Sequence, residues 1–105
     1  GLWAQWRLEE TGGGQRAPGE FVLLSCRVSG FSFGGYGIRW YRRAPGGGLE
    51  WVSSISSSGN VTKYGASVEG RATASRDSFQ PQSSLSLRAL HARDSARYFC
   101  AFARR

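Results

Sequence analysis

Two cysteines place the strongest constraint on how this chain can fold. Cys26 and Cys100 are separated by most of the sequence, and each lies in a β-prone, largely apolar segment. This setting favours a disulfide inside a hydrophobic core, which would stabilise the fold by roughly 4 kcal/mol because it closes a long loop. Such a bond indicates an oxidising, extracellular compartment. Two buried free thiols are the alternative that these residues leave open.

The segment around Cys26 alternates with a period of two. Val22, Leu24, Cys26 and Val28 share one face of an extended chain, as a half-buried strand requires. Further β-prone runs cover residues 38–42, 49–53, 62–64, 72–75, 85–90 and 96–102. Clusters of Gly, Pro and Ser separate them, and a short turn is expected over residues 89–94. The spacing predicts an all-β fold, an antiparallel sandwich or barrel, without the helices of a parallel sheet.

The composition indicates one small globular domain and excludes several classes of function. At 40% hydrophobic and 20% charged residues, the chain can bury one core. No apolar run approaches the roughly 20 residues of a membrane helix, and residues 1–4 lack a secretory signal, so we expect a mature, soluble segment. One His and two Cys cannot complete a zinc site, so no metal or cofactor is expected.

The net charge is +7, from 14 basic and 7 acidic residues, which would permit binding to a polyanion. The arginines are scattered, with close pairs only at residues 42–43 and 104–105, so no basic stripe is visible. Neither nucleic acid nor a membrane is expected as a partner, and polyanion binding is kept as a third hypothesis. No enzyme is expected either, since His91 is the only imidazole and no nucleophile elbow or phosphate loop occurs.

Several motifs in sequence order resemble an antibody heavy-chain variable domain of the immunoglobulin family. Trp40 stands between the two cysteines, and Tyr98 lies two residues before the second one, within the segment DSARYFC. The segment WYRRAPGGGLEWVS, residues 40–53, resembles the second framework region, and residues 10–14, 29–33 and 76–77 agree. We assign residues 5–105 to one variable domain and residues 1–4 to an extension outside the family pattern.

The resemblance implies a secreted, antigen-binding, two-sheet V-type sandwich. Cys26 and Cys100 would be the inter-sheet disulfide, with Trp40 packed against it and Tyr98 forming the tyrosine corner. Arg71 and Asp94 match the framework ion pair, whose role is structural because removing one partner of a buried pair is costly.

Antigen contacts are implied on the loops between the framework segments, residues 32–37 and 54–63. Tyr36 is the expected anchor, because tyrosine offers a large rigid contact area and its glycine neighbours would leave it exposed. Solvated turns are the alternative. Phe31, Phe33 and Ile38 are expected to pack the first loop on the sandwich. The expected contact residues are Ser32, Gly34, Gly35, Tyr36, Gly37, Arg39, Ser54, Ser56, Ser57, Ser58, Gly59, Asn60, Thr62, Lys63, Phe102 and Arg104.

Asn60-Val61-Thr62 is a sequon for N-glycosylation within the second loop. A glycan on Asn60 is possible in a secreted protein, and a bare side chain is the alternative because so short a motif often occurs by chance.

The chain also departs from the family pattern. It stops at residues 101–105, so the last strand and most of the third hypervariable loop are expected to be missing, and an open sheet edge favours strand exchange or aggregation. Ala72, Ala74 and Ser83 stand where the family carries larger apolar side chains, and losses of that size cost about 2 to 5 kcal/mol each. A self-associating or structural fragment is therefore the alternative function.

The partner of the domain is also open. Tyr41, Arg43, Leu49 and Trp51 correspond to the face that meets a light chain, and Leu49 and Trp51 keep the pattern of a paired domain. Tyr41 is more typical of camelid single domains, and Arg43 replaces the glutamine that bonds to the light chain. Burying that charge without a counterion is costly, which favours a domain that acts alone. A light chain and a second copy are the other possible partners.

Overall fold

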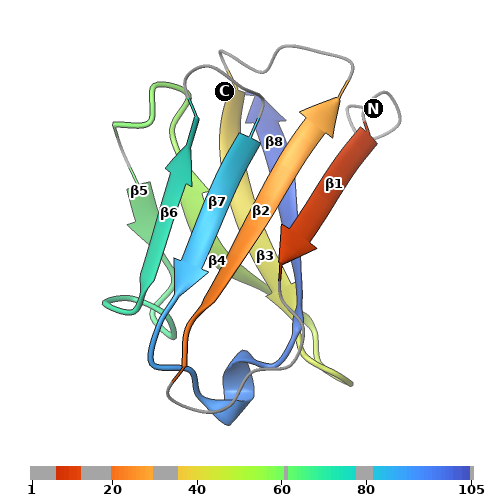
Figure 1. Cartoon of the computed structure of the whole chain (residues 1–105), viewed down its shortest axis with the longest axis vertical. Helices are drawn as coiled ribbons and strands as arrows, with labels where there is room; N and C mark the ends of the chain where they lie inside the picture. The colour runs from red at the N-terminus through yellow and green to blue at the C-terminus, as the bar shows by residue number, and fades with distance from the viewer. Residues whose placement is uncertain (1–6, 13–19, 30–35, 61, 78–81, 105) are drawn as a thin grey trace.

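The computed structural model describes residues 7–12, 20–29, 36–60, 62–77 and 82–104. They form two four-stranded antiparallel sheets that face each other (Figure 1), with strand orders β1-β2-β7-β6 and β5-β4-β3-β8. The strands are β1 (Arg7–Gly12), β2 (Val22–Ser29), β3 (Tyr36–Arg43), β4 (Leu49–Ile55), β5 (Thr62–Tyr64), β6 (Ala72–Arg76), β7 (Gln82–Leu87) and β8 (Arg97–Arg104), with a 3-10 helix at Ala92–Asp94. The predicted all-β sandwich is confirmed.

Strand β1 is present in the structure but was not predicted from the sequence. Its sequence, RLEETG, is mostly polar and carries little periodic signal, and it becomes a strand by pairing with β2 from Arg7↔Ser29 to Gly12↔Leu24. The strand expected over residues 85–90 ends earlier, at Leu87. Ala89 has a φ of +49°, a left-handed conformation that a strand cannot contain. The turn expected over residues 89–94 is present and contains the 3-10 helix.

The core lies between the two sheets and is centred on the disulfide. Cys26 of β2 is bonded to Cys100 of β8, with 6.3 Å between their Cα atoms, so the bond joins the sheets as predicted. Trp40 is fully buried beside it, as are Leu85 and Leu87. These contacts hold the sheets together at the middle of the sandwich.

Three small residues, Ala72, Ala74 and Ser83, stand where larger apolar side chains were expected. All three are buried and face this core. The indole N–H of Trp40 donates to Ser83 Oγ at 3.2 Å, and that hydroxyl donates to the carbonyl of Ser75 at 2.7 Å. Ser83 thus replaces apolar packing with hydrogen bonds that give the buried indole N–H a partner.

Strand β8 lies at the edge of its sheet. It pairs with β3 along its whole length, from Tyr36↔Arg104 to Arg43↔Arg97, and β3 is its only hydrogen-bonded neighbour strand among the described residues. The boundary expected at residue 5 lies outside the described residues. No helix in the described part of the chain has the length and hydropathy to cross a membrane.

Candidate functional site

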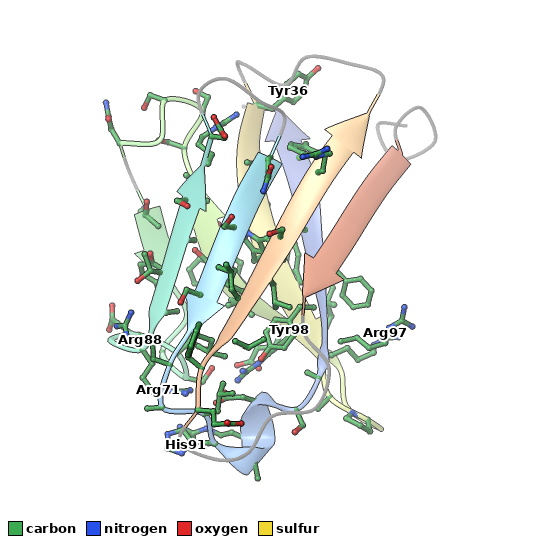
Figure 2. All side chains as sticks on the ribbon, viewed as in Figure 1. Tyr36, Arg71, Arg88, His91, Arg97 and Tyr98 are labelled. Carbon is green, nitrogen blue, oxygen red and sulfur yellow. A yellow bond between two sulfur atoms is a disulfide. The ribbon has the colours of Figure 1, made fainter. Side chains whose placement is uncertain are left out.

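Segments that are far apart in the sequence meet at one end of the sandwich. Strand β3 begins there at Tyr36, and β8 reaches the same end because Tyr36 pairs with Arg104. The hairpin between β4 and β5, which contains the second predicted loop, turns there as well (Figure 1). Figure 2 shows Tyr36 at this end and Arg71 and His91 at the opposite end. The two ends are called the loop end and the framework end below.

The hairpin between β4 and β5 is a tight, serine-rich turn. The N–H of Gly59 donates to the carbonyl of Ser56 at 3.0 Å, and Gly59 has a φ of +84°, which favours glycine. The hydroxyls of Ser56 and Ser58 lie 3.2 Å apart, and the N–H of Asn60 donates to Ser58 Oγ at 3.3 Å. These local bonds fix the backbone of the turn, while Ser58 and Asn60 stay exposed.

Arg76, at the end of β6, connects the first and second loops. Its Nη1 donates to the carbonyl of Tyr36 at 2.6 Å and to the carbonyl of Ser56 at 3.0 Å. Burial lowers the pKa of Arg76 below its usual value. The sequence assigned Arg76 no functional role beyond a family motif, because the carbonyls of Tyr36 and Ser56 are backbone atoms and leave no trace in the pattern of side chains. The only available signal was an arginine where an alternating strand reaches the loop end.

Two of the predicted contact residues lie deeper than expected. Tyr36 is half-buried and packs against the core cluster, although its glycine neighbours were expected to leave it exposed. Phe102 is 3% exposed and belongs to the core, which corrects its expected role as an antigen contact. The reason is that β8 continues through its pairing with Ile38 and turns the Phe102 side chain inward. Ile38 is fully buried in the core, and its expected packing against the first loop stays a prediction because residues 30–35 lie outside the described residues.

The remaining predicted contacts differ in accessibility. Arg39, Ser58, Asn60 and Lys63 are exposed, and those partly exposed are Gly37, Ser54, Ser56, Ser57, Gly59 and Thr62. Ser32, Gly34 and Gly35 lie outside the described residues, as do Phe31, Phe33 and the side chain of Arg104. A polar, serine-rich surface with one lysine therefore covers the described part of the loop end.

At the framework end, the carboxylate of Asp94 is shared by two arginines. Arg71 Nη1 lies 2.8 Å from Oδ2, and Arg42 Nη1 lies 2.8 Å from Oδ1. The N–H of His91 donates to Oδ2 at 2.7 Å, and the Tyr98 hydroxyl donates to the Asp94 carbonyl at 2.7 Å. The expected Arg71–Asp94 ion pair and tyrosine corner are thus both present.

The charges in this cluster shift one another's pKa values. Burial alone would raise the pKa of Asp94, but hydrogen bonds from Arg71, His91 and Arg42 hold it well below the usual range. Hydrogen bonds from Arg42 and Ser67 lower the pKa of Glu50. The hydrogen bond to Asp94 raises the pKa of Arg71. All of these groups are therefore charged at neutral pH, and the cluster stabilises the fold as ion pairs.

Arg42 is the central member of the cluster and was missed by the sequence reasoning. It is 3% exposed and also bonds to Glu50 Oε1 at 2.7 Å, Tyr98 Oη at 3.1 Å and Ser67 Oγ at 3.2 Å. Burial alone would lower the pKa of Arg42, but its bonds to Glu50, Tyr98 and Asp94 raise it above the usual value. The signal was available, because Ile38, Trp40 and Arg42 alternate onto the same inward face.

The acidic side chains of the charged cluster at the framework end are engaged in ion pairs. Within the described ranges, no group of three or more His, Cys, Asp or Glu side chains could hold a metal ion. Asp94 and Glu50 are both engaged by arginine. The charged cluster at the framework end is therefore structural.

The four residues predicted to meet a partner do share one surface. Trp51, Tyr41 and Phe99 form a row across β4, β3 and β8, and Leu49, Arg43 and Arg97 form the next row. Leu49 is 60% exposed and Trp51 is 38% exposed. Phe99 and Arg97 were not among the predicted members, since their place on this surface depends on the β3–β8 register.

Comparison with known proteins agrees with this arrangement. A family model for the immunoglobulin V-set domain matches residues 15–105. A mouse protein, the Ig heavy chain V region MOPC 141, is 41% identical over 98 residues, which cover 93% of this chain and 67% of that protein. Both findings confirm the resemblance to heavy-chain variable domains and the prediction that the chain is not an enzyme.

Proposed function

The chain belongs to the immunoglobulin V-set family, and from this premise we propose that it binds an antigen non-covalently through the loop end. The contacts would come from Tyr36 and from the hairpin over residues 54–63. Serine, glycine and asparagine supply adaptable hydrogen bonds in such a surface, and tyrosine supplies a rigid contact.

The observation that carries this proposal is the bonding of Arg76 to the backbones of both loops. Because Arg76 bonds to the carbonyls of Tyr36 and Ser56, it ties the start of β3 to the second loop through backbone atoms. Ser58, Asn60 and Lys63 then remain exposed for a partner. A backbone that is held in place before binding lowers the entropy lost on binding.

The compartment and the domain partner follow the same proposal. A disulfide in the core supports secretion, because such bonds persist in oxidising compartments. Exposed Leu49 and Trp51 on the β3–β4–β8 face support pairing with a second variable domain through that face. Antigen binding at the loop end does not depend on this pairing.

The test compares two display libraries of equal size in the wild-type background. One randomises Tyr36, Ser54, Ser57, Ser58 and Lys63 at the loop end. The other randomises Phe21, Leu23, Thr73, Ser84 and Ser86 on the outer face of the other sheet. Selection against purified lysozyme should yield specific, folded binders from the loop library at a far higher frequency. Equal yields from both libraries would contradict the proposal.

Two further measurements separate this proposal from its alternatives. A self-associating fragment would show a sedimentation coefficient that rises with protein concentration, whereas an antigen-binding monomer would not. A polyanion binder would lose affinity for heparin steeply between 50 and 200 mM salt, at roughly the slope expected for several phosphate or sulfate contacts. Lysozyme binders selected from the loop library should depend less on salt.

A further inference from the structure

The outward surface of β3, β4 and β8 has an unusual distribution of charge. We call it the pairing face, and it consists of Arg39, Tyr41, Arg43, Leu49, Trp51, Arg97 and Phe99. The aromatic row of Trp51, Tyr41 and Phe99 crosses its middle. Arg39 lies on one side of this row, and Arg43 and Arg97 lie on the other.

Arg43 and Arg97 are directly opposite each other in the β3–β8 register. Both side chains are exposed, and the guanidinium carbon of Arg97 lies 5.4 Å from the centroid of the Phe99 ring. Figure 2 shows Arg97 directed away from the sandwich. Two like charges at opposite positions in neighbouring strands destabilise a sheet, so this pair costs stability in the isolated chain.

Among the described side chains, no ion pair with Arg43 or Arg97 is formed. None of the outward-facing residues on β3, β4, β5 and the described side chains of β8 is acidic. Glu50, the nearest acid along β4, is bonded to Arg42 and to Ser67 at the framework end. If the aromatic row is covered by a partner, the charges of Arg43 and Arg97 must be desolvated together. That burial is favourable only with a carboxylate placed against them.

We propose that the pairing face binds a second variable domain that presents a carboxylate to Arg43 and Arg97. The inference rests on the proposed pairing through this face. Apolar side chains of the partner cover Leu49, Trp51 and Tyr41, and its Asp or Glu accepts hydrogen bonds from the two guanidinium groups. Arginine suits this contact because its planar fork of N–H donors matches a carboxylate.

The same charges argue against a second copy of this chain as the partner. A two-fold symmetric contact through the pairing face uses the same patch of both copies, so it places the Arg43 and Arg97 pairs of both copies in one interface. Four arginines from the Arg43 and Arg97 pairs would then meet in one interface. Each chain also carries a net charge of +7, which adds a general repulsion.

The test uses two light-chain variable domains that differ at one residue. The first has glutamine at the position that meets the counterpart of Arg43 in antibodies, and the second has glutamate there. At 50 mM salt, the wild-type domain should bind the glutamate form about tenfold more tightly, measured by titration calorimetry. Arg43→Gln should remove that preference, and Arg97→Gln should reduce it.

Arg39→Gln is the matched control, because Arg39 lies on the pairing face beyond the aromatic row, next to Ala101 instead of Arg97. It should leave the preference for glutamate within about twofold of wild type.

Equal binding of both light-chain domains would overturn the proposal, as would a failure to bind either one. Dimerisation of the wild-type chain alone at 100 µM would overturn the argument against a second copy. Antigen selection from the loop library needs no partner domain, so it can succeed even if pairing fails.

Discussion

A buried arginine and a partly buried one, at opposite ends of the sandwich, bond to different kinds of acceptor. Arg42 at the framework end bonds to the carboxylates of Asp94 and Glu50. Arg76 at the loop end bonds to the backbone carbonyls of Tyr36 and Ser56. A substitution of Asp94 or Glu50 removes the carboxylate that Arg42 binds. A substitution of Tyr36 or Ser56 leaves the backbone carbonyl that Arg76 binds in place. The framework end therefore restricts its sequence, whereas Arg76 constrains no side chain at Tyr36 or Ser56 through these bonds.

Asp94→Ala should have the largest effect on stability. It leaves the buried Arg42 and the partly buried Arg71 without their shared carboxylate, and breaking a buried pair in this way costs about 3 to 5 kcal/mol. Urea unfolding at neutral pH measures the change. Glu69→Ala is the control, since Glu69 is exposed, and it should change the free energy of unfolding by less than about 0.5 kcal/mol. Equal losses of unfolding free energy in the Asp94→Ala and Glu69→Ala variants would contradict the special role of the carboxylate at the framework end.

Arg76→Met should cost less, about 1 to 3 kcal/mol, because it leaves the backbone carbonyls of Tyr36 and Ser56 without this donor. The amide signals of residues 36–37 and 54–60 should shift in NMR spectra, while those of residues 91–98 should not. Arg88→Met is the matched control, since Arg88 is an exposed arginine that bonds to Thr73 and Gly70. Shifts at the framework end in the Arg76 variant would show that the two ends are not separate.

Acidification should weaken the framework end selectively. The pKa of Asp94 is lower in the folded protein than in the unfolded chain, so its stabilisation is complete above the unfolded value near 3.9 and is lost as the pH falls below it. The loss attributable to Asp94 should be about 1 kcal/mol between pH 6 and pH 3, with an added contribution from Glu50. The Arg76 variant should keep this dependence. The Asp94→Ala variant should lose the Asp94 part, and an unchanged pH profile there would contradict the assignment.

A glycan at Asn60 should have the smallest effect on the fold. Asn60 is exposed in the hairpin between β4 and β5, which supports its use as a sequon in a secretory host. We expect a mass increase that N-glycosidase removes and that Asn60→Gln abolishes, with a change in unfolding free energy below about 0.5 kcal/mol. Thr62→Ser should keep the glycan. A wild-type mass equal to that of the Asn60→Gln variant would show an unused site.

Much of the fold could be predicted because its signals lie in side chains with fixed roles. Cys26, Cys100 and Trp40 form the core that the sequence indicated, and the alternation around Cys26 matches β2. The same logic applied to Ile38, Trp40 and Arg42 would have placed Arg42 inside. Strand β1 could not be predicted, because its pairing with β2 forms it and its own sequence has no apolar alternation.

The candidate site was harder to predict, since its geometry depends on contacts between distant segments. The bonds from Arg76 to Tyr36 and Ser56 cross between β6, β3 and the hairpin after β4. The burial of Phe102 follows from the length of β8 and its pairing with Ile38. Alternation with Cys100, two residues earlier on the same inward face, could have placed Phe102 in the core. The bonds of Arg76 leave no such local pattern, so nothing in the sequence assigned it a role.

The most direct test of the account is to map where the wild-type domain contacts a bound protein. The protein that binds it most tightly on an array of purified secreted proteins would be titrated into the isotope-labelled domain. We predict that amide signals change at Tyr36, Gly37 and residues 54–63, and that those of Arg71, Asp94 and Tyr98 stay in place. Changes centred on the framework end, or on the outer face around Phe21 and Leu23, would contradict recognition at the loop end.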